Sequence, residues 1–294
     1  MNMNIRDFVR RLGWWFTYLG PRRDITINTF NGLLSFDSKD WLIGKYLYVR
    51  RSYEAAEMQR AIALLRDEGY ISENNRGTVL DVGANIGMTC IALLKLGYFN
   101  RAIAFEPAPN SYRLLSRNVL QNAFTDKIVH FPWALSSAQG EAELEISHDN
   151  SGNNRLRRTK QAGAFKEEKR RTVTVKVRIL DDVMATEPAL RAEKISVIWL
   201  DVEGHEGHFF LGAQKLLEQP IPVVTEFWPY AVSRSGMSRR EFCDILTRLF
   251  THFYVLTSHT CEKQPIYQFD DLFDVYKRPR EMCQVILIAA PSQI

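Results

Sequence analysis

The stretch Asp81-Val82-Gly83-Ala84-Asn85-Ile86-Gly87 decides the fold expected of this chain. It follows the apolar run Thr78-Val79-Leu80 and leads directly into another apolar segment, residues 88–94. The pattern indicates a strand closed by an acid, a turn with two glycines, and a helix. Glycine lets the backbone bend tightly and lets a ligand approach, because a Cβ would obstruct both. A strand, turn and helix of this kind predict a crevice for a nucleotide-like ligand.

The composition sets bounds on the kind of protein. The chain has 294 residues, enough for one large domain or a domain with an appendage. Its net charge of +4 is small for this length, so nucleic acid is not the expected partner. The four cysteines (Cys90, Cys243, Cys261 and Cys283) form no CxxC pair. We therefore expect reduced thiols in a cytoplasmic protein.

The N-terminal residues 5–16 mix arginines with aromatic residues. They predict an end helix packed on the main domain, and the alternative is an interfacial helix that makes peripheral contact with a membrane. No apolar run reaches the roughly 18 residues that a membrane span needs. No small-residue cleavage site follows a clean apolar core, so a signal peptide is not expected.

Strands and helices alternate through most of the chain. Seven strands are predicted over residues 78–82, 102–105, 128–131, 195–200, 223–227, 253–256 and 285–289. Helices are predicted over 52–66 and 88–96, from about Ser111 with Asn110 as its cap, and from Ser238 with a capping box to Glu241. This alternation predicts an α/β fold: a mostly parallel seven-stranded sheet with helices on both faces.

Two segments stand outside that alternation. Residues 1–75 predict a lead-in of helices and a short hairpin (strands 25–27 and 33–36), packed on a main domain of residues 76–294. Strands over 141–146 and 172–178 predict a two-strand insertion. Between them, residues 147–171 are polar and rich in Lys and Arg, which predicts a mobile, solvated loop. The alternative for this loop is a lid or a clamp for an anionic substrate.

The first turn distinguishes between two cofactors. The dinucleotide fingerprint G-x-G-x-x-G needs a middle glycine to admit a pyrophosphate, and here Asn85 occupies that place. Asp81 would repel a phosphate and suits a cofactor with an ammonium group, such as S-adenosylmethionine. Glu106 ends the next strand, where a carboxylate can accept hydrogen bonds from both ribose hydroxyls. Pro107 then turns the chain away.

The chain resembles the FkbM-type methyltransferases over roughly residues 53–227. The resemblance rests on Tyr53-Glu54, the Asp81–Gly87 stretch, Glu106-Pro107, Ala134-Leu135-Ser136, Leu180-Asp181-Asp182-Val183, Trp199-Leu200-Asp201-Val202-Glu203-Gly204-His205-Glu206 and Leu211-Gly212-Ala213. It implies a Rossmann-like class I methyltransferase fold and O-methylation of sugar or natural-product hydroxyls. The cofactor residues are expected to be Asp81, Gly83, Ala84, Asn85, Gly87, Glu106, Pro107 and Tyr53.

The strand 195–200 should lie beside the first strand, so its end places Asp201 at the crevice. A base near the acceptor hydroxyl would accelerate methyl transfer by roughly 10²–10⁴-fold. Asp201 and His205 are the candidates, with Glu203 beside them. Two alternatives stay open: Asp201 binds the methionine end of the cofactor, and His205 caps the next helix.

A divalent metal is a further alternative at this position. Asp201, Glu203 and His205 together could hold Mg²⁺ or Mn²⁺ and acidify the hydroxyl, although the hypothesis without a metal is favoured.

The acceptor contacts are predicted from position in the sequence. Glu226 ends the strand 223–227, and Trp228 follows it where an aromatic wall could stack on a sugar. Glu54, with Tyr53, precedes the first strand and could close over the cofactor.

These observations favour an S-adenosylmethionine-dependent O-methyltransferase acting on a hydroxyl of a sugar, glycan or secondary metabolite. The alternatives are an RNA or protein N-methyltransferase and a noncatalytic cofactor-binding scaffold. A nicotinamide oxidoreductase ranks last because the middle glycine is absent.

Overall fold

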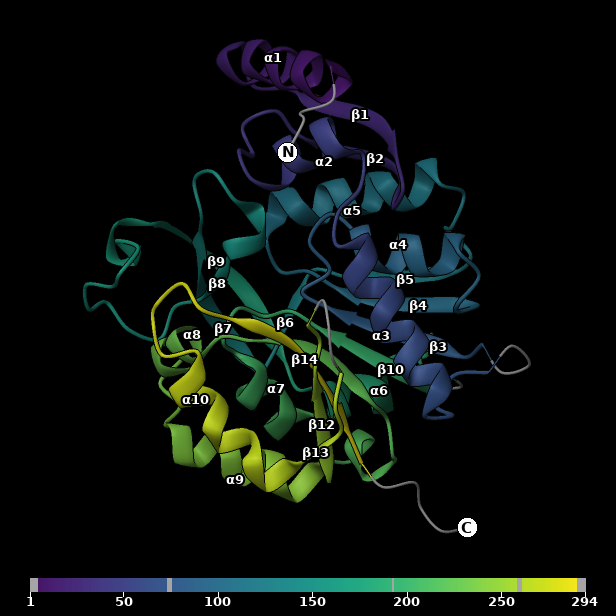
Figure 1. The fold of residues 1–294 in the computed structure, drawn as a ribbon, viewed down its shortest axis with the longest axis vertical. Coiled ribbons are helices and arrows are strands. Elements are labelled where there is room, and N and C mark those ends of the chain that lie inside the picture. The colour runs from purple at the N-terminus through teal and green to yellow at the C-terminus, as the bar shows by residue number, and fades with distance from the viewer. Residues whose placement is uncertain (1–4, 73–75, 192, 258–260, 290–294) are drawn as a thin grey trace.

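The computed structural model describes residues 5–72, 76–191, 193–257 and 261–289 (Figure 1). Its centre is an eight-stranded sheet in the order β13-β12-β14-β11-β10-β3-β4-β5. The strands are β3 (Thr78–Val82), β4 (Arg101–Phe105), β5 (Ile128–Phe131), β10 (Ile195–Leu200), β11 (Val223–Phe227), β12 (His252–Val255), β13 (Gln264–Pro265) and β14 (Cys283–Ile288).

The mostly parallel sheet that the sequence predicted is confirmed. From β11 through β10, β3 and β4 to β5 all pairings are parallel, whereas β14 runs antiparallel to both of its neighbours. The two-residue β13 adds an eighth strand at the edge, antiparallel to β12.

The sheet is covered on both faces because its central strands are apolar on both. In β3 all five residues are buried, and Val79 and Leu80 belong to different hydrophobic cores. The Val79 core includes α3 (Ala55–Asp67), α4 (Met88–Lys95) and α5 (Pro109–Gln121). The Leu80 core includes α6 (Leu180–Thr186), α7 (Glu206–Gly212), η3 (Leu216–Glu218), α8 (Pro229–Arg234), α9 (Arg239–Leu249), η4 (Ile266–Asp271) and α10 (Leu272–Val275).

The lead-in shares its core with the sheet. It consists of α1 (Ile5–Leu19), β1 (Asp24–Thr29), β2 (Gly32–Asp37), α2 (Ile43–Arg50) and α3. Trp14 of α1 is fully buried, with its ring 6.3 Å from that of Phe36. The Asn118 side chain of α5 accepts from the Ser35 N–H at 2.7 Å and donates to the Ser35 carbonyl at 3.1 Å. These contacts fix the hairpin on α5.

The insertion forms a second sheet in the order β6-β9-β7-β8. The expected strands are β7 (Gly140–Ile146) and β9 (Arg171–Arg178), and β6 (Trp133–Leu135) and β8 (Arg155–Leu156) join them. The segment expected to be a solvated loop also contains η1 (Ser151–Asn153) and η2 (Glu167–Lys169). The expectation of solvation is wrong for Arg155 and Glu167, which are 5% and 0% exposed because they pair with each other.

Two helix starts can be compared with the sequence. The capping box is confirmed, since the Ser238 side chain accepts from the Glu241 N–H and Glu241 bonds back to Ser238. The cap assigned to Asn110 is wrong. The α5 helix begins two residues earlier than expected, with extended Ala108 before it and Pro109 in its first position. Proline suits that position because its missing N–H has no partner there anyway.

Candidate functional site

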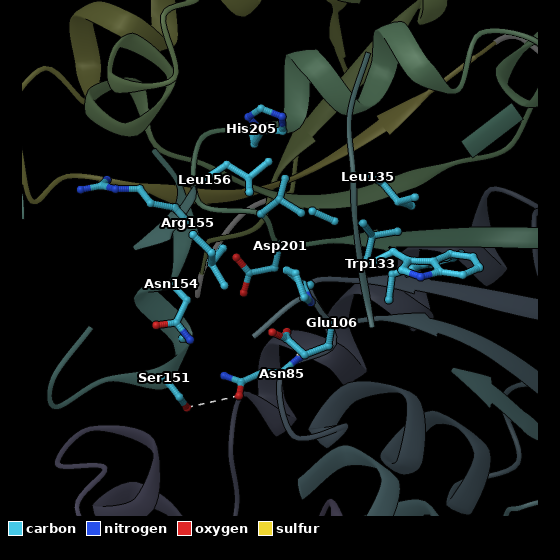
Figure 2. Close-up of a pocket in the computed structure, with 18 residues that line it drawn as sticks. Asn85, Glu106, Trp133, Leu135, Ser151, Asn154, Arg155, Leu156, Asp201 and His205 are labelled. Atoms are coloured by element: carbon cyan, nitrogen blue, oxygen red, sulfur yellow. Dashed lines mark hydrogen bonds between the residues drawn. The ribbon is translucent and has the colours of Figure 1, made fainter. Parts of the chain in front are cut away.

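A cavity opens at the carboxyl ends of β3, β4 and β10 (Figure 2). Its walls come from the main sheet and from the insertion. They are Val82, Gly83, Asn85, Phe105, Glu106, Pro107, Trp133, Ala134, Leu135, Leu144, Ser151, Gly152, Asn154, Arg155, Leu156, Asp201, Val202 and His205. Figure 2 shows Glu106 and Asp201 directed into the same space, with Asn85 and Ser151 on one side of it.

The first turn presents Gly83 and Asn85 to the cavity. The N–H groups of Gly83 and Ala84 both donate to the Phe105 carbonyl, at 2.9 and 3.0 Å, which ties the turn to β4. Asn85 adopts a positive φ of 50°, a conformation that Asn tolerates better than most residues. Its side chain lies at the cavity.

Other residues of the motif lie beneath the cavity. The Asp81 carboxylate is buried and accepts from the Cys90 N–H at 3.1 Å, so it holds the start of α4. Burial raises its pKa to about 6, opposed by the hydrogen bond from Cys90. Ala84 and Gly87 do not line the cavity, and Gly87 packs against Leu115 of α5.

Glu106 is held at the cavity through both of its carboxylate oxygens. One accepts from the Asn85 N–H at 2.8 Å and the other from the Ala108 N–H at 2.7 Å. Burial raises the pKa of Glu106 to about 7, and these two hydrogen bonds oppose the rise. Each oxygen keeps a second lone pair, so the carboxylate can accept further hydrogen bonds from a ligand.

One wall of the cavity is aromatic. Trp133 follows β5, and its ring stacks on that of Phe131 at 4.6 Å between centroids. Phe131 in turn stacks on Phe105 of β4 at 5.3 Å. The wall therefore continues the core of the sheet and offers a flat apolar surface beside Glu106.

The insertion covers the cavity and is held by buried charges. Arg155 donates to Glu145 at 3.3 Å and to Glu167 at 2.5 Å. Glu167 also accepts from the Tyr230 hydroxyl at 2.7 Å, which joins the insertion to α8. The Ser151 hydroxyl bonds to the Asn85 side chain at 3.2 Å (Figure 2). The cover thus contacts the first turn directly.

Asp201 lies at the end of β10 beside an acidic cluster. One oxygen each from Asp201, Glu203 and Glu226 lies within 4.8 Å of the others. The Asp201 carboxyl group is exposed to the cavity, but the protein around it displaces water and so disfavours its ionised form. The negative charges of Glu203 and Glu226 disfavour ionisation further. Both effects raise the pKa of Asp201 well above its usual range. Burial likewise raises the pKa of Glu226 to about 8, with Glu54 adding repulsion.

Glu203 has an uncommon backbone conformation and a buried carboxylate oxygen without a partner in the described part of the chain, two features typical of ligand-binding residues. Its φ is +54°, an uncommon conformation for a residue with a side chain. Its Oε2 atom is buried and has no hydrogen-bond partner among the described residues. Three carboxylates at this spacing could hold a divalent cation or share protons.

His205 does not join the acidic cluster. Its Nε2 bonds to the Ser136 hydroxyl at 2.9 Å, and its ring stacks on His208 at 4.4 Å. Burial, His208 and Arg158 lower its pKa well below the usual value, so the imidazole is neutral. It occupies the N-cap position of α7, but its side chain makes no capping bond. The three residues of the alternative metal set therefore do not come together, and Glu226 rather than His205 lies with Asp201 and Glu203.

The remaining predicted residues lie outside the cavity lining. The Tyr53 backbone forms two hydrogen bonds with the Asn31 side chain. Glu54 precedes α3 as its N-cap residue, and its charge raises the pKa of Asp201 and of Glu226. Trp228 is 3% exposed, and its Nε1 donates to the Pro279 carbonyl at 2.7 Å. Its role in this structure is packing under the insertion, where its ring lies 5.8 Å from that of Phe165.

Trp133, Ser151, Asn154 and Arg155 line the cavity but were not predicted as site residues. Trp133 could have been found, because it follows the third parallel strand, whose end lies at the same edge of the sheet. Arg155 could not, because its basic surroundings in the sequence resemble a solvated loop and its partner Glu145 belongs to another strand.

The strand order, the glycine turn after β3 and the cavity at the strand ends define a Rossmann-like fold of the class I methyltransferase type. Residues 81–256 match the model of the methyltransferase FkbM domain. The chain belongs to the FkbM methyltransferase family.

Two curated relatives are similar to this chain. It is 28% identical to methyltransferase sdnD of Sordaria araneosa over 170 residues, which cover 51% of this chain and 66% of sdnD, just under two thirds. It is 24% identical to the 2-O-methyltransferase NoeI of Sinorhizobium fredii over 179 residues, covering 57% of this chain and 70% of NoeI.

Two solved structures are also similar. The methyltransferase FkbM of Methylobacillus flagellatus matches with a TM-score of 0.42 and 16% identity, over 72% of this chain and 43% of that one. The O-methyltransferase of Bacillus cereus in complex with SAH matches with a TM-score of 0.43 and 10% identity, over 81% of this chain and 82% of that one.

Proposed function

We propose that this protein is an S-adenosylmethionine-dependent O-methyltransferase that acts on a hydroxyl of a sugar, glycan or secondary metabolite. The observation that carries the proposal is that Glu106 and Asp201 face one cavity from β4 and β10, the two strands on either side of β3. Glu106 binds the ribose hydroxyls, and the aromatic wall around Trp133 receives the adenine. Gly83 and Asn85 would contact the rest of the cofactor, which would supply the methyl group, with Asp201 at the same cavity.

The charge of the site favours this cofactor over a dinucleotide. S-adenosylmethionine carries a sulfonium and an ammonium group, which the carboxylates of Glu106, Asp201, Glu203 and Glu226 attract. A pyrophosphate would meet the same carboxylates and be repelled. Binding of the cationic cofactor also stabilises the ionised forms of these carboxyl groups, which burial otherwise disfavours.

Asp201 is the proposed base for the acceptor. In the reaction the acceptor oxygen forms a bond to the methyl carbon while the bond from that carbon to sulfur breaks, and the hydroxyl proton passes to the Asp201 carboxylate. Glu203 and Glu226 share protons with Asp201 and orient its side chain. His205, neutral and bonded to Ser136, supports the backbone after Asp201 and takes no proton. The name of NoeI as a 2-O-methyltransferase supports oxygen as the methyl acceptor.

The test is transfer of a radiolabelled methyl group from S-adenosylmethionine to a panel of methyl glycosides and hydroxylated polyketides. Label in a base-stable ether product supports the proposal. Label in RNA or protein nitrogen, with none in any hydroxyl compound, would overturn the acceptor class. Tight cofactor binding without label in any of these compounds would favour the scaffold alternative.

A further inference from the structure

The helix α1 has two apolar faces: one is buried, and the other is largely exposed, with Trp15 in edge contact with Trp41 at 5.1 Å between ring centroids. Trp14 is fully buried against the lead-in. The opposite side exposes large apolar residues that belong to no core: Phe8 at 48%, Val9 at 60%, Leu12 at 46%, Trp15 at 50%, Phe16 at 77% and Leu19 at 72%. At 3.6 residues per turn these six side chains fall within an arc of about 120°. We call them the α1 outer face.

The α1 outer face lies at one end of the molecule. Figure 1 shows α1 as the outermost element along the longest axis, with β1 and α2 beneath it. A contiguous apolar stripe in that position marks an interaction surface, since scattered single exposed residues would not align on one helix face.

The charge around this face is strongly positive. Residues 1–51 carry nine Lys and Arg against four Asp and Glu, whereas the whole chain is only +4. Arg6 and Arg11 border the two edges of the outer face at helical spacing. The acids nearby are neutralised, since Asp7 pairs with Arg50 and Asp37 with Arg22.

A basic hollow extends from α1 toward the insertion. It runs from Tyr18 to the start of β9. The described residues that line it include no acid, and its basic members are Arg22, Lys39, Lys166, Lys169, Arg170 and Arg171, of which Arg22 pairs with Asp37 and Arg170 with Glu145. An anionic surface that meets the α1 outer face would therefore meet a second source of positive charge.

We propose that α1 lies in the plane of an anionic membrane surface, with its outer face at the boundary between headgroups and acyl chains. An apolar stripe flanked by arginines fits that position, because the stripe leaves water while the arginines reach lipid phosphates. A second copy of this chain would bring together two surfaces of the same positive charge, so the bilayer is the favoured occupant. No helix among the described residues is long and apolar enough to cross a membrane, so the attachment is peripheral.

The test is co-sedimentation of the full chain with phosphatidylcholine vesicles, prepared with and without phosphatidylglycerol. We expect binding to the anionic vesicles, weaker binding to the neutral ones, and loss of binding as NaCl is raised. Phe16→Glu should lower the bound fraction about tenfold. Tyr267→Glu is the matched control, because Tyr267 is 72% exposed in η4, away from α1.

Each other outcome overturns the proposal. Absence of binding, equal binding to both vesicle types, or wild-type binding by Phe16→Glu would exclude an anionic bilayer as the occupant. A dimer in light scattering that dissociates in Phe16→Glu would assign the face to a second copy. The melting temperatures of both variants are measured as a control. If they equal that of the wild type, neither the loss of vesicle binding nor the loss of a dimer comes from unfolding.

Discussion

A Cβ placed on Gly83 would lie 1.7 Å from the backbone oxygen of Asp201, so the first turn and the end of β10 are in backbone contact. The Asp201 N–H also donates to the Val82 carbonyl at 2.9 Å, which extends the β3–β10 pairing past the strand ends. The proposed cofactor turn and the proposed base are therefore fixed relative to each other by main-chain atoms.

Gly83→Ala should disrupt this contact. The new methyl group would overlap the Asp201 carbonyl, and alanine is strained at the Gly83 φ of +85°. We expect a loss of more than about 3 kcal/mol in the free energy of unfolding, measured in urea. Gly236→Ala is the control: Gly236 has a φ of +84° but nothing within 4 Å of its Cβ position, so only the strain of about 1–2 kcal/mol applies. Equal losses in both variants would show that the close approach is unimportant.

Glu106→Gln should weaken cofactor binding. The amide NH₂ group would face one of the two backbone N–H groups, of Asn85 or Ala108, and one acceptor for the ribose would be lost. The lost ribose hydrogen bond to a charged acceptor, about 1.5–3 kcal/mol, corresponds to roughly 10–100-fold lower affinity for S-adenosylhomocysteine in calorimetry. Glu218→Gln, on an exposed turn of η3, serves as the control. Wild-type affinity in Glu106→Gln would remove the ribose assignment.

Asp201→Asn should lower turnover by about 10²–10⁴-fold, because an amide cannot take the hydroxyl proton. The affinity for S-adenosylhomocysteine should change only a few-fold, since that product needs no base. Single-turnover methyl transfer and calorimetry on the same preparation separate the two effects. If affinity falls and single-turnover transfer does not, Asp201 binds the methionine end of the cofactor instead.

The free energy of unfolding should fall as the pH rises from about 5 to 8. The pKa values of Glu106, Glu206 and Glu226 are about 7, 7 and 8 in the folded protein, raised chiefly by burial. The folded state therefore holds protons that the unfolded chain releases near its normal pKa. The slope is negative, at about 1.4 kcal/mol per pH unit for each carboxyl that stays protonated.

Urea titrations of the cofactor-free protein in EDTA at several pH values measure this slope. Glu226→Gln should flatten it, and Glu218→Gln should leave it unchanged. A stability that is constant or rises between pH 5 and 8 would contradict the shared protonation of the cluster.

At acid pH a different carboxyl group matters. Hydrogen bonds and Arg155 overcome the burial of Glu167 and lower its pKa to about 2, so its contribution to the free energy of unfolding is lost as the pH falls from about 4.5 toward 2.

The proposal that protons rather than a cation relieve the repulsion among Asp201, Glu203 and Glu226 predicts that methyl transfer survives dialysis against EDTA. Initial rates before and after dialysis, and after Mg²⁺ or Mn²⁺ is restored, measure this. A loss of rate that Mg²⁺ or Mn²⁺ restores would instead make the three carboxylates a metal site, with Glu226 in the position that the sequence assigned to His205.

The sequence predicted most of the sheet because its strands are unbroken apolar runs closed by characteristic residues. Asp81 and Gly83 located the first turn, and Glu106 and Asp201 followed from the rule that parallel strands end at one edge. The packing of the insertion over the cavity was not predictable in the same way. Arg155 is buried by Glu145 and Glu167, a pairing between strands that no local pattern reveals. Glu226 was expected at the end of the strand 223–227, but its place beside Asp201 and Glu203 was not, because the pairing of β11 with β10 is seen only in the folded sheet.

Calorimetric titration of the wild-type protein with S-adenosylhomocysteine and, separately, with NAD tests the central claim most directly. We predict saturable binding of S-adenosylhomocysteine at one site per chain and no measurable binding of NAD. Binding of NAD, or no heat of binding with S-adenosylhomocysteine where circular dichroism shows a folded protein, would contradict the assignment of this cavity to S-adenosylmethionine.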